Sequence, residues 1–278
     1  MLPPRTFDRD LIASHLRRRP ATAEDFVTRL VLDDLMERLA VVTRDFERAA
    51  ILSPDARAMP ERGNSRQSSF TFERYSTVLD WALDPERLTL PHTDYDLIVS
   101  IFDLQVVNDV VGFLTRARQH LRPDGLFIAA ALGGDSLMEL RQSFLAAEAE
   151  MGGASARVAP FIPLADAGGL LQRAGLALPV TDIEKHVVRY ADPMALMQEI
   201  RALGGSNPLL DKPARLMTPR RLIAAAQAYA EQFSDTDGRI RATLEIIWMS
   251  GWAPHERQQK PLRPGSAQVS LKDILGKN

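Results

Sequence analysis

Residues 95–132 constrain the fold of this chain more than any other segment. Tyr95–Ser100 is a short apolar run, Val110–Leu121 repeats apolar residues with the period of a helix, and Leu126–Leu132 is a second apolar run. The residues Arg122–Gly125 predict a tight turn before the second run. A strand, a helix and a strand in this order form a βαβ unit, whose two strands lie parallel in one sheet. The sequence therefore predicts an α/β fold.

Other elements follow from end signals and periodicity. Thr22, Asn108, Asp192 and Thr218 are predicted helix N-caps, the last two followed by a proline that suits the first helical turn. We also predict a short strand over Ala49–Leu52, a loop over 60–69, a helix over Asp166–Gly175, a strand over Val180–Tyr190 and a strand containing Ala242–Trp248.

The chain is long enough for one large domain, since 278 residues with 45% hydrophobic content can bury a substantial core. We expect a single domain over 1–278. Its parts are a helical segment at 1–48, a Rossmann-like core at 49–178, C-terminal strands and helices at 179–250 and an extended tail at 251–278.

Charge and composition argue against several functions. The 34 basic and 36 acidic residues nearly cancel, which gives no electrostatic basis for binding nucleic acid. There is no cysteine, and the five histidines lack a paired ligand spacing, so we expect no metal site. The longest clean apolar run, Leu126–Leu132, is too short to span a membrane. We therefore expect no membrane span and a cytoplasmic location.

Three segments, Asp84–Pro91, Asp96–Ser100 and Leu121–Phe127, together resemble the class I methyltransferases that depend on S-adenosylmethionine (SAM). Asp84–Pro91 is similar to the stretch that follows the third strand in that family, and Asp96–Ser100 is similar to its fourth strand. Leu121–Phe127 resembles the turn into its fifth strand. The resemblance implies a Rossmann-like sheet with flanking helices, and SAM as cofactor.

Gly133–Arg141 looks like a signature of one branch of this family. That branch contains the methyltransferase-like, arginine-hydroxylase-like assembly factor of respiratory complex I and its bacterial relatives, near the malonyl-carrier-protein methyltransferases of biotin synthesis. Phe7–Arg9, the Asp192 helix with its Gly204-Gly205 stop, and Gly251–Ser270 agree with it. The resemblance implies a complex I subunit as partner.

The glycine-rich loop of the family is missing. In the family this loop follows the first strand and cradles the methionine part of SAM, because only glycine lets the backbone approach so closely. Of sixteen glycines, only Gly63 precedes residue 112, and the expected position reads Ile51–Ala58 with Pro54 inside it. The interval from Ile51 to Tyr95 is also short by about one βα unit. We therefore predict a fold shortened in its N-terminal half, with a degenerate SAM loop.

The resemblance assigns cofactor contacts to Asp84, Ser100 and Gln105. Asp84 stands where the family contacts the adenine amine, although it could equally cap a helix. Gln105 stands where relatives often carry a His-Trp pair, so that aromatic ring is absent. Glu73 is a weak candidate for the acid that holds the ribose.

The segment after the second apolar run supplies a substrate or partner surface. It consists of Gly133, Gly134, Asp135, Glu139 and Arg141, which follow the carboxyl end of a predicted strand, where α/β sheets place their sites. The alternative is that Asp135 or Ser136 merely caps the next helix.

Two functions remain open. The first is a methyltransferase-like protein with a degenerate SAM loop that acts on or binds a respiratory-chain subunit. The alternative is an active SAM-dependent methyltransferase of a small-molecule, carrier-protein or protein substrate. Hydroxylation is a third activity of the branch, but no oxidant-handling residue can be named in this sequence.

Overall fold

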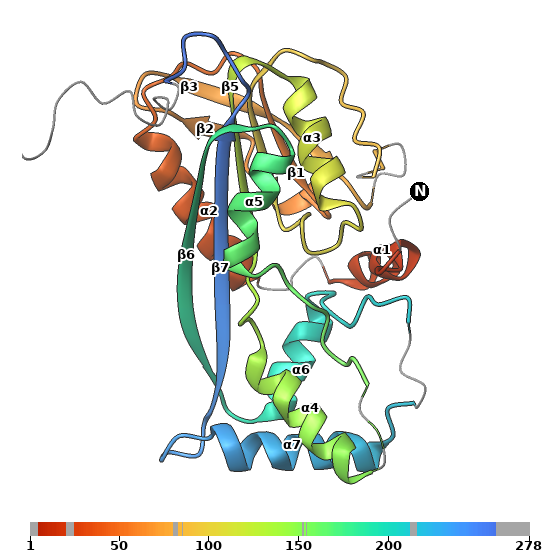
Figure 1. Ribbon diagram of the computed structural model, residues 1–278. Helices are drawn as coiled ribbons and strands as arrows, with labels where there is room; N and C mark the ends of the chain where they lie inside the picture. Colours follow the sequence, from red (N-terminus) through yellow and green to blue (C-terminus); the bar gives the residue numbers. More distant parts are fainter. Residues whose placement is uncertain are drawn as a thin grey trace, which may run out of the picture.

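The computed structural model describes residues 5–20, 25–79, 83–84, 86–151, 153, 155–211 and 216–259. Its centre is a seven-stranded sheet in the order β2-β3-β1-β4-β5-β7-β6, with helices on both faces (Figure 1). The strands are β1 Ala49–Ser53, β2 Arg62–Asn64, β3 Ser69–Ser76, β4 Tyr95–Ile101, β5 Leu121–Leu132, β6 Ala177–Tyr190 and β7 Ile240–Trp252. The helices are α1 Arg9–Arg18, α2 Phe26–Ala40, the 3₁₀ turn η1 Ala56–Ala58, α3 Val110–His120, α4 Met138–Glu150, α5 Leu164–Arg173, α6 Pro193–Ala202 and α7 Pro219–Phe233.

The predicted α/β fold is confirmed: β3, β1, β4 and β5 run parallel, and the Rossmann-like sheet carries its core on both faces. Every residue of β1 and β4 is buried, as expected for strands covered on both sides. One apolar cluster packs under α2 and another under α3 and α5. The last two strands, β7 and β6, join antiparallel.

The N-terminal half of the sheet is shortened. Between β1 and β3 the chain forms only η1 and β2, and β2 pairs antiparallel with β3 as a hairpin. The predicted loop over 60–69 is therefore wrong at 62–64 and at 69, where residues pair in that hairpin and Gly63 lies directly against the ring of Phe70. No full helix separates the first two parallel strands.

Helix starts differ from prediction at two of the four caps. Asp25 caps α2 by accepting the backbone amide three residues on at 2.8 Å, and the predicted cap Thr22 lies outside the described residues. Asp109, not Asn108, caps α3 in the same way at 2.8 Å. Asp192 and Thr218 cap α6 and α7 as predicted.

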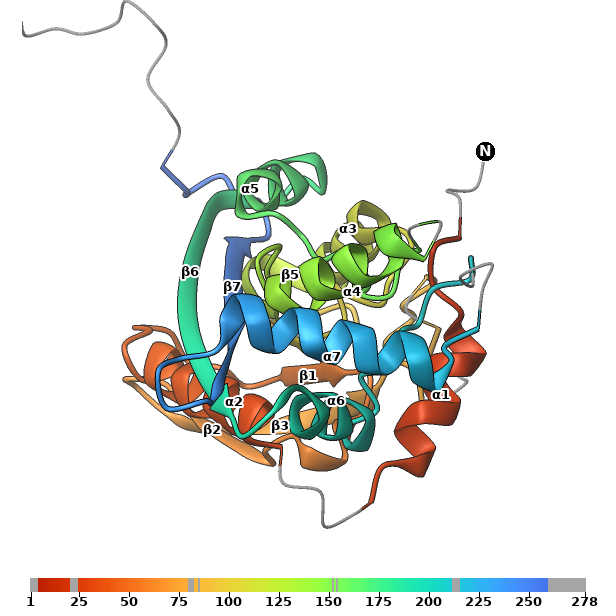
Figure 2. The same cartoon turned by 90° about the horizontal axis from the view of Figure 1, so that it is seen from below.

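The far end of β6 and β7 carries a separate cluster of helices. α4, α6 and α7 pack together beyond the parallel strands, around a core that includes Phe144, Leu196 and Tyr229. Seen from below, α7 crosses the molecule with α4 and α6 on either side (Figure 2). Trp252, predicted to lie in the extended tail, is instead the last residue of β7, with the Arg44 guanidinium 5.4 Å from its ring.

Candidate functional site

The parallel strands β3, β1, β4 and β5 all end at one edge of the sheet. We call it the carboxyl edge, defined by Ser76, Ser53, Ile101 and Leu132. Open α/β sheets bind ligands outside the carboxyl ends of their strands. The functional site is therefore expected here.

The chain leaves β1 through a turn that is closed by its own side chains. Ser53, Asp55 and Ala56 are buried, and none of residues 53–58 has a positive φ. Asp55 caps η1 and binds the Arg57 guanidinium, with 2.7 Å between Oδ2 and Nη2. Burial acts to raise the pKa of Asp55, but the hydrogen bonds from Arg57 outweigh it and lower that pKa. This turn is an ion-paired 3₁₀ segment without a glycine.

Helix α1 covers the same part of the carboxyl edge. Ile12, Ala13 and Leu16 are buried in a small cluster with Val78, just beyond β3. Arg57 adds a hydrogen bond of 3.2 Å to the carbonyl oxygen of Leu16. The space beyond the ends of β1 and β3 is thus occupied by the chain itself.

Asp84 is one of the groups that hold α1 in place. It forms an ion pair with Arg9, whose guanidinium also donates to the carbonyl oxygens of Thr77 and Leu83. Its carboxylate accepts the Glu86 amide at 2.9 Å. The described residues 86–94 form turns and irregular structure, so the predicted helix cap is wrong, and the carboxylate is engaged by this chain.

A buried carboxyl group, not singled out from the sequence, lies at the end of β4. Asp103 is fully buried and accepts hydrogen bonds from the hydroxyls of Thr77 and Ser100, the latter at 2.7 Å. Burial raises the pKa of Asp103 to about 7, against the lowering effect of these two hydroxyls. The preceding Phe102 has φ 66°, a strained value for a residue other than glycine. Ser100, a predicted cofactor contact, is therefore committed to Asp103.

Next to this carboxyl group the edge opens into a hollow of about 610 Å³. Its walls come from the first described residues, the loop after β4, residues 160–163 and α5, and they include Phe7, Leu104, Phe161 and Leu170. Gln105, which the resemblance assigns to the cofactor, lines the hollow, and its side-chain oxygen accepts the Leu132 amide at 2.9 Å. The volume falls in the range of sites for small ligands.

One wall of the hollow is fastened by Asn108. Its side-chain oxygen accepts the backbone amides of Thr6 and Phe7 at 2.6 and 2.9 Å. The Glu86 carboxylate in turn accepts the Asn108 amide at 2.7 Å. Asn108 thus positions the N-terminal segment at the hollow instead of capping a helix.

Glu73 lies away from the carboxyl edge. It pairs with Ala50 near the start of β1 and accepts hydrogen bonds from Tyr75 and Tyr95 at 2.7 and 2.6 Å. Tyr95 is the first residue of β4, so this carboxylate belongs to the amino ends of the strands. Its weak candidacy as a ribose acid is not supported by this position.

Gly133 and Gly134 bring the backbone close to β7 and to residues 162–163. A Cβ on Gly133 would lie 2.3 Å from Oε1 of Glu245, and the Gly133 amide donates to the Glu245 carbonyl oxygen at 2.8 Å. Gly133 also forms a bridge with Ile162, which lines the hollow. The glycine pair therefore borders the hollow through its backbone.

The side chains that follow the glycine pair make contacts away from the hollow. Ser136 is buried and donates to the Glu245 carbonyl oxygen, and the residue that precedes α4 is Leu137, with φ 56° and no side-chain cap. Neither Asp135 nor Ser136 caps α4, so that alternative is wrong. Asp135 is exposed and binds Lys185 at 2.8 Å.

Glu139 and Arg141 differ in exposure. Glu139 is buried and accepts the Thr243 amide at 3.0 Å, which anchors α4 to β7. This burial removes it from the predicted surface. Arg141 is half-buried and donates to the carbonyl oxygens of Gly134 and Ser136, both at 3.4 Å.

Sequence reasoning missed Arg9, Asp103 and Asn108 as organisers of the carboxyl edge. Each acts on a partner distant in the chain, such as Thr77 for both Arg9 and Asp103. The local signal for Asp103 was a carboxyl residue two positions after the end of a buried strand. Within the described residues, no three His, Cys, Asp or Glu side chains are grouped as metal ligands would be, and no helix there has the length and apolarity needed to cross a membrane.

Two groups of known proteins are similar to this chain. Human mitochondrial arginine-hydroxylase NDUFAF5 is 40% identical over 192 residues, which are 69% of this chain and 55% of the relative. The Danio rerio protein of that name is 36% identical over 192 residues, or 69% of this chain and 60% of the relative. A malonyl-[acyl-carrier protein] O-methyltransferase from Xylella fastidiosa is 30% identical over 207 residues, or 74% of this chain and 67% of the relative.

The length of these alignments is limited. Among five arginine-hydroxylase relatives, the chain spans between 42% and 60% of the relative. No family model matches the chain. Among solved structures, the YcgJ protein of Bacillus subtilis aligns with 82% of this chain and 99% of its own at 12% identity, and the TM-score of 0.48 is too low to support an inference.

The sequence relatives and the Rossmann-like sheet agree on one assignment. The chain belongs to the class I SAM-dependent methyltransferase family, in the branch that includes the NDUFAF5 arginine-hydroxylases and the malonyl-[acyl-carrier protein] O-methyltransferases.

Proposed function

We propose that this protein acts by binding a subunit of respiratory complex I at the hollow of the carboxyl edge, and that it does not hold SAM in the usual place. Its methyltransferase fold then serves as a binding scaffold, because a fold alone does not fix a function.

The observation that carries the proposal is the filled end of β1. A SAM loop needs backbone amides open to the ligand, and here the turn after β1 is closed by Pro54, by the Asp55–Arg57 ion pair and by α1. Asp84 and Ser100 are likewise engaged, by Arg9 and Asp103. The residues present do not fit the methionine part of SAM.

The hollow remains as the place for a partner. Its walls are mostly apolar, with the exposed charges of Asp166 and Arg173 at its lining. Such a hollow suits an apolar side chain of a protein segment, with polar contacts to fix its direction. The similarity to relatives named mitochondrial arginine-hydroxylases, together with the resemblance of Gly133–Arg141 to the branch of the complex I assembly factor, supports a respiratory-chain protein as the partner.

The alternative is an active methyltransferase. It is favoured by the similarity to enzymes named malonyl-[acyl-carrier protein] O-methyltransferases, at 30% and 35% identity. That reading requires SAM to enter the hollow near Gln105 instead of the end of β1.

Calorimetric titration distinguishes a binding protein from an active methyltransferase. The full chain is titrated with SAM and with S-adenosylhomocysteine, beside a malonyl-carrier-protein methyltransferase as positive control. We expect no binding at millimolar ligand. Stoichiometric binding at micromolar ligand would contradict the proposal and support the enzyme.

Capture from detergent-solubilised membranes of the native organism tests the partner. Ala165 is an exposed residue of α5 that lines the hollow, so Ala165→Arg fills the hollow without disturbing the core. Wild type should enrich a complex I subunit, and Ala165→Arg should lose it. Ala149→Arg, at an exposed position of α4, is the matched control and should behave as wild type. Equal capture by all three proteins would reject the hollow as the binding site.

A further inference from the structure

The outward face of α7 has no partner within the described chain. Ala225 and Tyr229 bury the inner side of this helix in the cluster with α4 and α6. On the other side Ile223 is 57% exposed. Arg220 and Glu231 are also exposed, and with Ile223 they follow the spacing of one helical stripe. Figure 2 shows this helix lying across the outside of the molecule.

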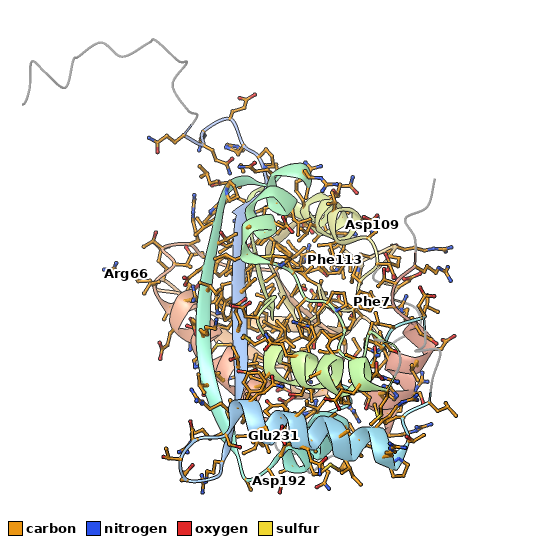
Figure 3. The ribbon with its side chains drawn as sticks, turned by 60° about the horizontal axis from the view of Figure 1, so that its bottom comes forward. Phe7, Arg66, Asp109, Phe113, Asp192 and Glu231 are labelled. Carbon is orange, nitrogen blue, oxygen red and sulfur yellow. The ribbon has the colours of Figure 1, made fainter. Side chains whose placement is uncertain are left out.

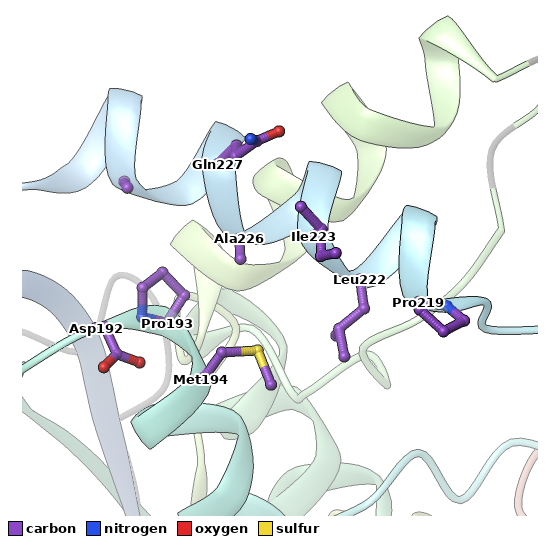
Figure 4. A pocket seen from close by; sticks show the side chains of 9 residues that line it. Asp192, Pro193, Met194, Pro219, Leu222, Ile223, Ala226 and Gln227 are labelled. Carbon is purple, nitrogen blue, oxygen red and sulfur yellow. The ribbon is translucent and has the colours of Figure 1, made fainter.

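An apolar groove runs beside this stripe. A hollow of about 500 Å³ lies between α6 and α7, walled by Met194, Pro219, Leu222, Ile223, Ala226 and Ala230 (Figure 4). The two alanines leave the space open, while Ile223 projects next to it. Met194, on the α6 side, is 37% exposed. The surface therefore has both a groove and, beside it, the exposed side chain of Ile223, which could enter the same groove on a second copy.

The charges of α7 run against its dipole. Acidic groups stabilise the first turn of a helix and basic groups the last turn. In α7 the first turn instead carries Arg220 and Arg221, and the end carries Glu231. Among the described residues, neither Arg220 nor Glu231 has an ion-pair partner.

The same reversed charges are complementary to a second, antiparallel copy of the helix. Arg220 stands six residues before Ala226, and Glu231 stands five residues after it. Asp192 lines the groove on the side away from Pro219 and adds negative charge there (Figure 4). Asp192 is the N-cap of α6 and Glu231 lies in the last turn of α7; both residues are labelled in Figure 3. A two-fold axis near Ala226 would bring each basic end to an acidic end.

We propose that α7 is a self-association surface, through which two copies of this chain pack antiparallel about a two-fold axis near Ala226. Ile223 of each copy enters the groove of the other beside Ala226 and Ala230, and Arg220 of each copy faces Glu231 of the other. Such an isologous contact closes as a dimer. Apolar burial supplies the affinity, and the charges set the direction, since exposed ion pairs contribute little energy.

A light-scattering series on the full chain tests the dimer. Over a range from low to high micromolar concentration, the average mass of wild type should rise from one chain to two. Ile223→Glu should remain monomeric. Val187→Glu is the matched control, because Val187 is 58% exposed on β6, and it should dimerise as wild type does. Unchanged melting temperatures would show that both variants are folded.

Charge reversal distinguishes a second copy from any other occupant. Arg220→Glu and Glu231→Arg should each raise the dimer dissociation constant by about 5- to 10-fold, and the double variant should restore it. An occupant of different sequence would not produce this rescue. Failure of the double variant to recover, with both single variants impaired, would overturn the antiparallel arrangement.

Cross-linking gives an independent result, because the chain contains no cysteine. Gln227→Cys places one thiol beside the proposed axis, and a short bis-maleimide should join two copies. Gln67→Cys, exposed in the loop before β3, should not cross-link at the same concentration. A wild type that stays monomeric at several hundred micromolar, or equal cross-linking at both positions, would refute the dimer and leave the groove to another partner.

Discussion

Among single residues, Asp103 is a buried carboxyl group at the carboxyl edge, next to the hollow. Its carboxyl group is fully buried between two hydroxyls, and its pKa of about 7 lies well above the usual value. A raised carboxyl pKa means that the folded state binds the proton more tightly than the unfolded state does. The stabilisation is complete below the unfolded pKa and is lost as pH rises through 7.

We therefore expect Asp103→Asn to remove part of the pH dependence of stability. The wild type should lose roughly 2–4 kcal/mol relative to the variant between about pH 4 and pH 8. Urea unfolding of both proteins across this range measures the difference, in which the other titrating groups cancel. Parallel stability curves would show that Asp103 does not titrate in this range.

Position 133 needs a glycine because the backbone there lies close to the Glu245 side chain, and not because it adopts an unusual φ. A Cβ added to Gly133 would meet the buried Glu245 side chain at 2.3 Å. Gly133→Ala should cost about 1–3 kcal/mol in the free energy of unfolding, as overpacking usually does.

Gly169 is the matched control, because no atom lies within 4 Å of its added Cβ and it lies inside α5. Gly169→Ala should stabilise the protein by about 0.5–1 kcal/mol. Chemical unfolding of the two variants measures both changes in the free energy of unfolding, a decrease for Gly133→Ala and an increase for Gly169→Ala. If Gly133→Ala matched the control, the contact with Glu245 would not limit this position.

The family resemblance located Gln105 after the fourth strand, and Gln105 does follow β4 and line the hollow. Its contact with a cofactor stays a prediction. The engagement of Asp84 and Ser100 by other side chains could not be predicted. Asp84 pairs with Arg9, which is far away in the chain, and Ser100 binds Asp103, which lies beyond the end of the strand. No local pattern reveals that pairing.

At the scale of elements, periodicity and caps predicted most of the parallel core and the C-terminal helices. The starts of α6 and α7 were predicted because proline and the capping residue give a local signal. The β2–β3 hairpin and the docking of α1 were not. Helix α1 offers only three buried residues, and the apolar side chains that pack with them include Val78, Leu79 and Val106, which lie far along the chain.

Docking of α1 can be tested through Ile12. Ile12→Ala removes buried apolar contacts and should weaken the helix locally by about 2–3 kcal/mol. Hydrogen exchange should then accelerate across residues 9–18. Arg17→Gln, at an exposed position of the same helix, should leave exchange near its wild-type rate.

Ile12→Ala also tests whether α1 blocks SAM binding. We expect Ile12→Ala still to bind no SAM, because the turn at 53–57 remains closed by Asp55 and Arg57. Binding gained by this variant alone would mean that α1 is a removable cover over a working site.

At the scale of the molecule, the two proposed surfaces belong to different parts of the fold. The hollow lies at the ends of the parallel strands, whereas the groove of α7 lies in the helical cluster beyond β6 and β7 (Figure 1). A dimer through α7 would therefore leave the hollow accessible in both copies. The overall sheet was predictable from one βαβ unit, but this division between two surfaces arises only from the packing of distant segments.

The attachment of the N-terminal segment also sets an order of events during synthesis. Thr6 and Phe7 are held by Asn108, and Arg9 by Asp84, so their binding places do not exist when these residues leave the ribosome. At about 5–20 residues per second, roughly 5–20 s pass before residue 108 is made. For that time the apolar side of α1 has no surface to pack against, and a chaperone that recognises short apolar stretches would find this helix uncovered.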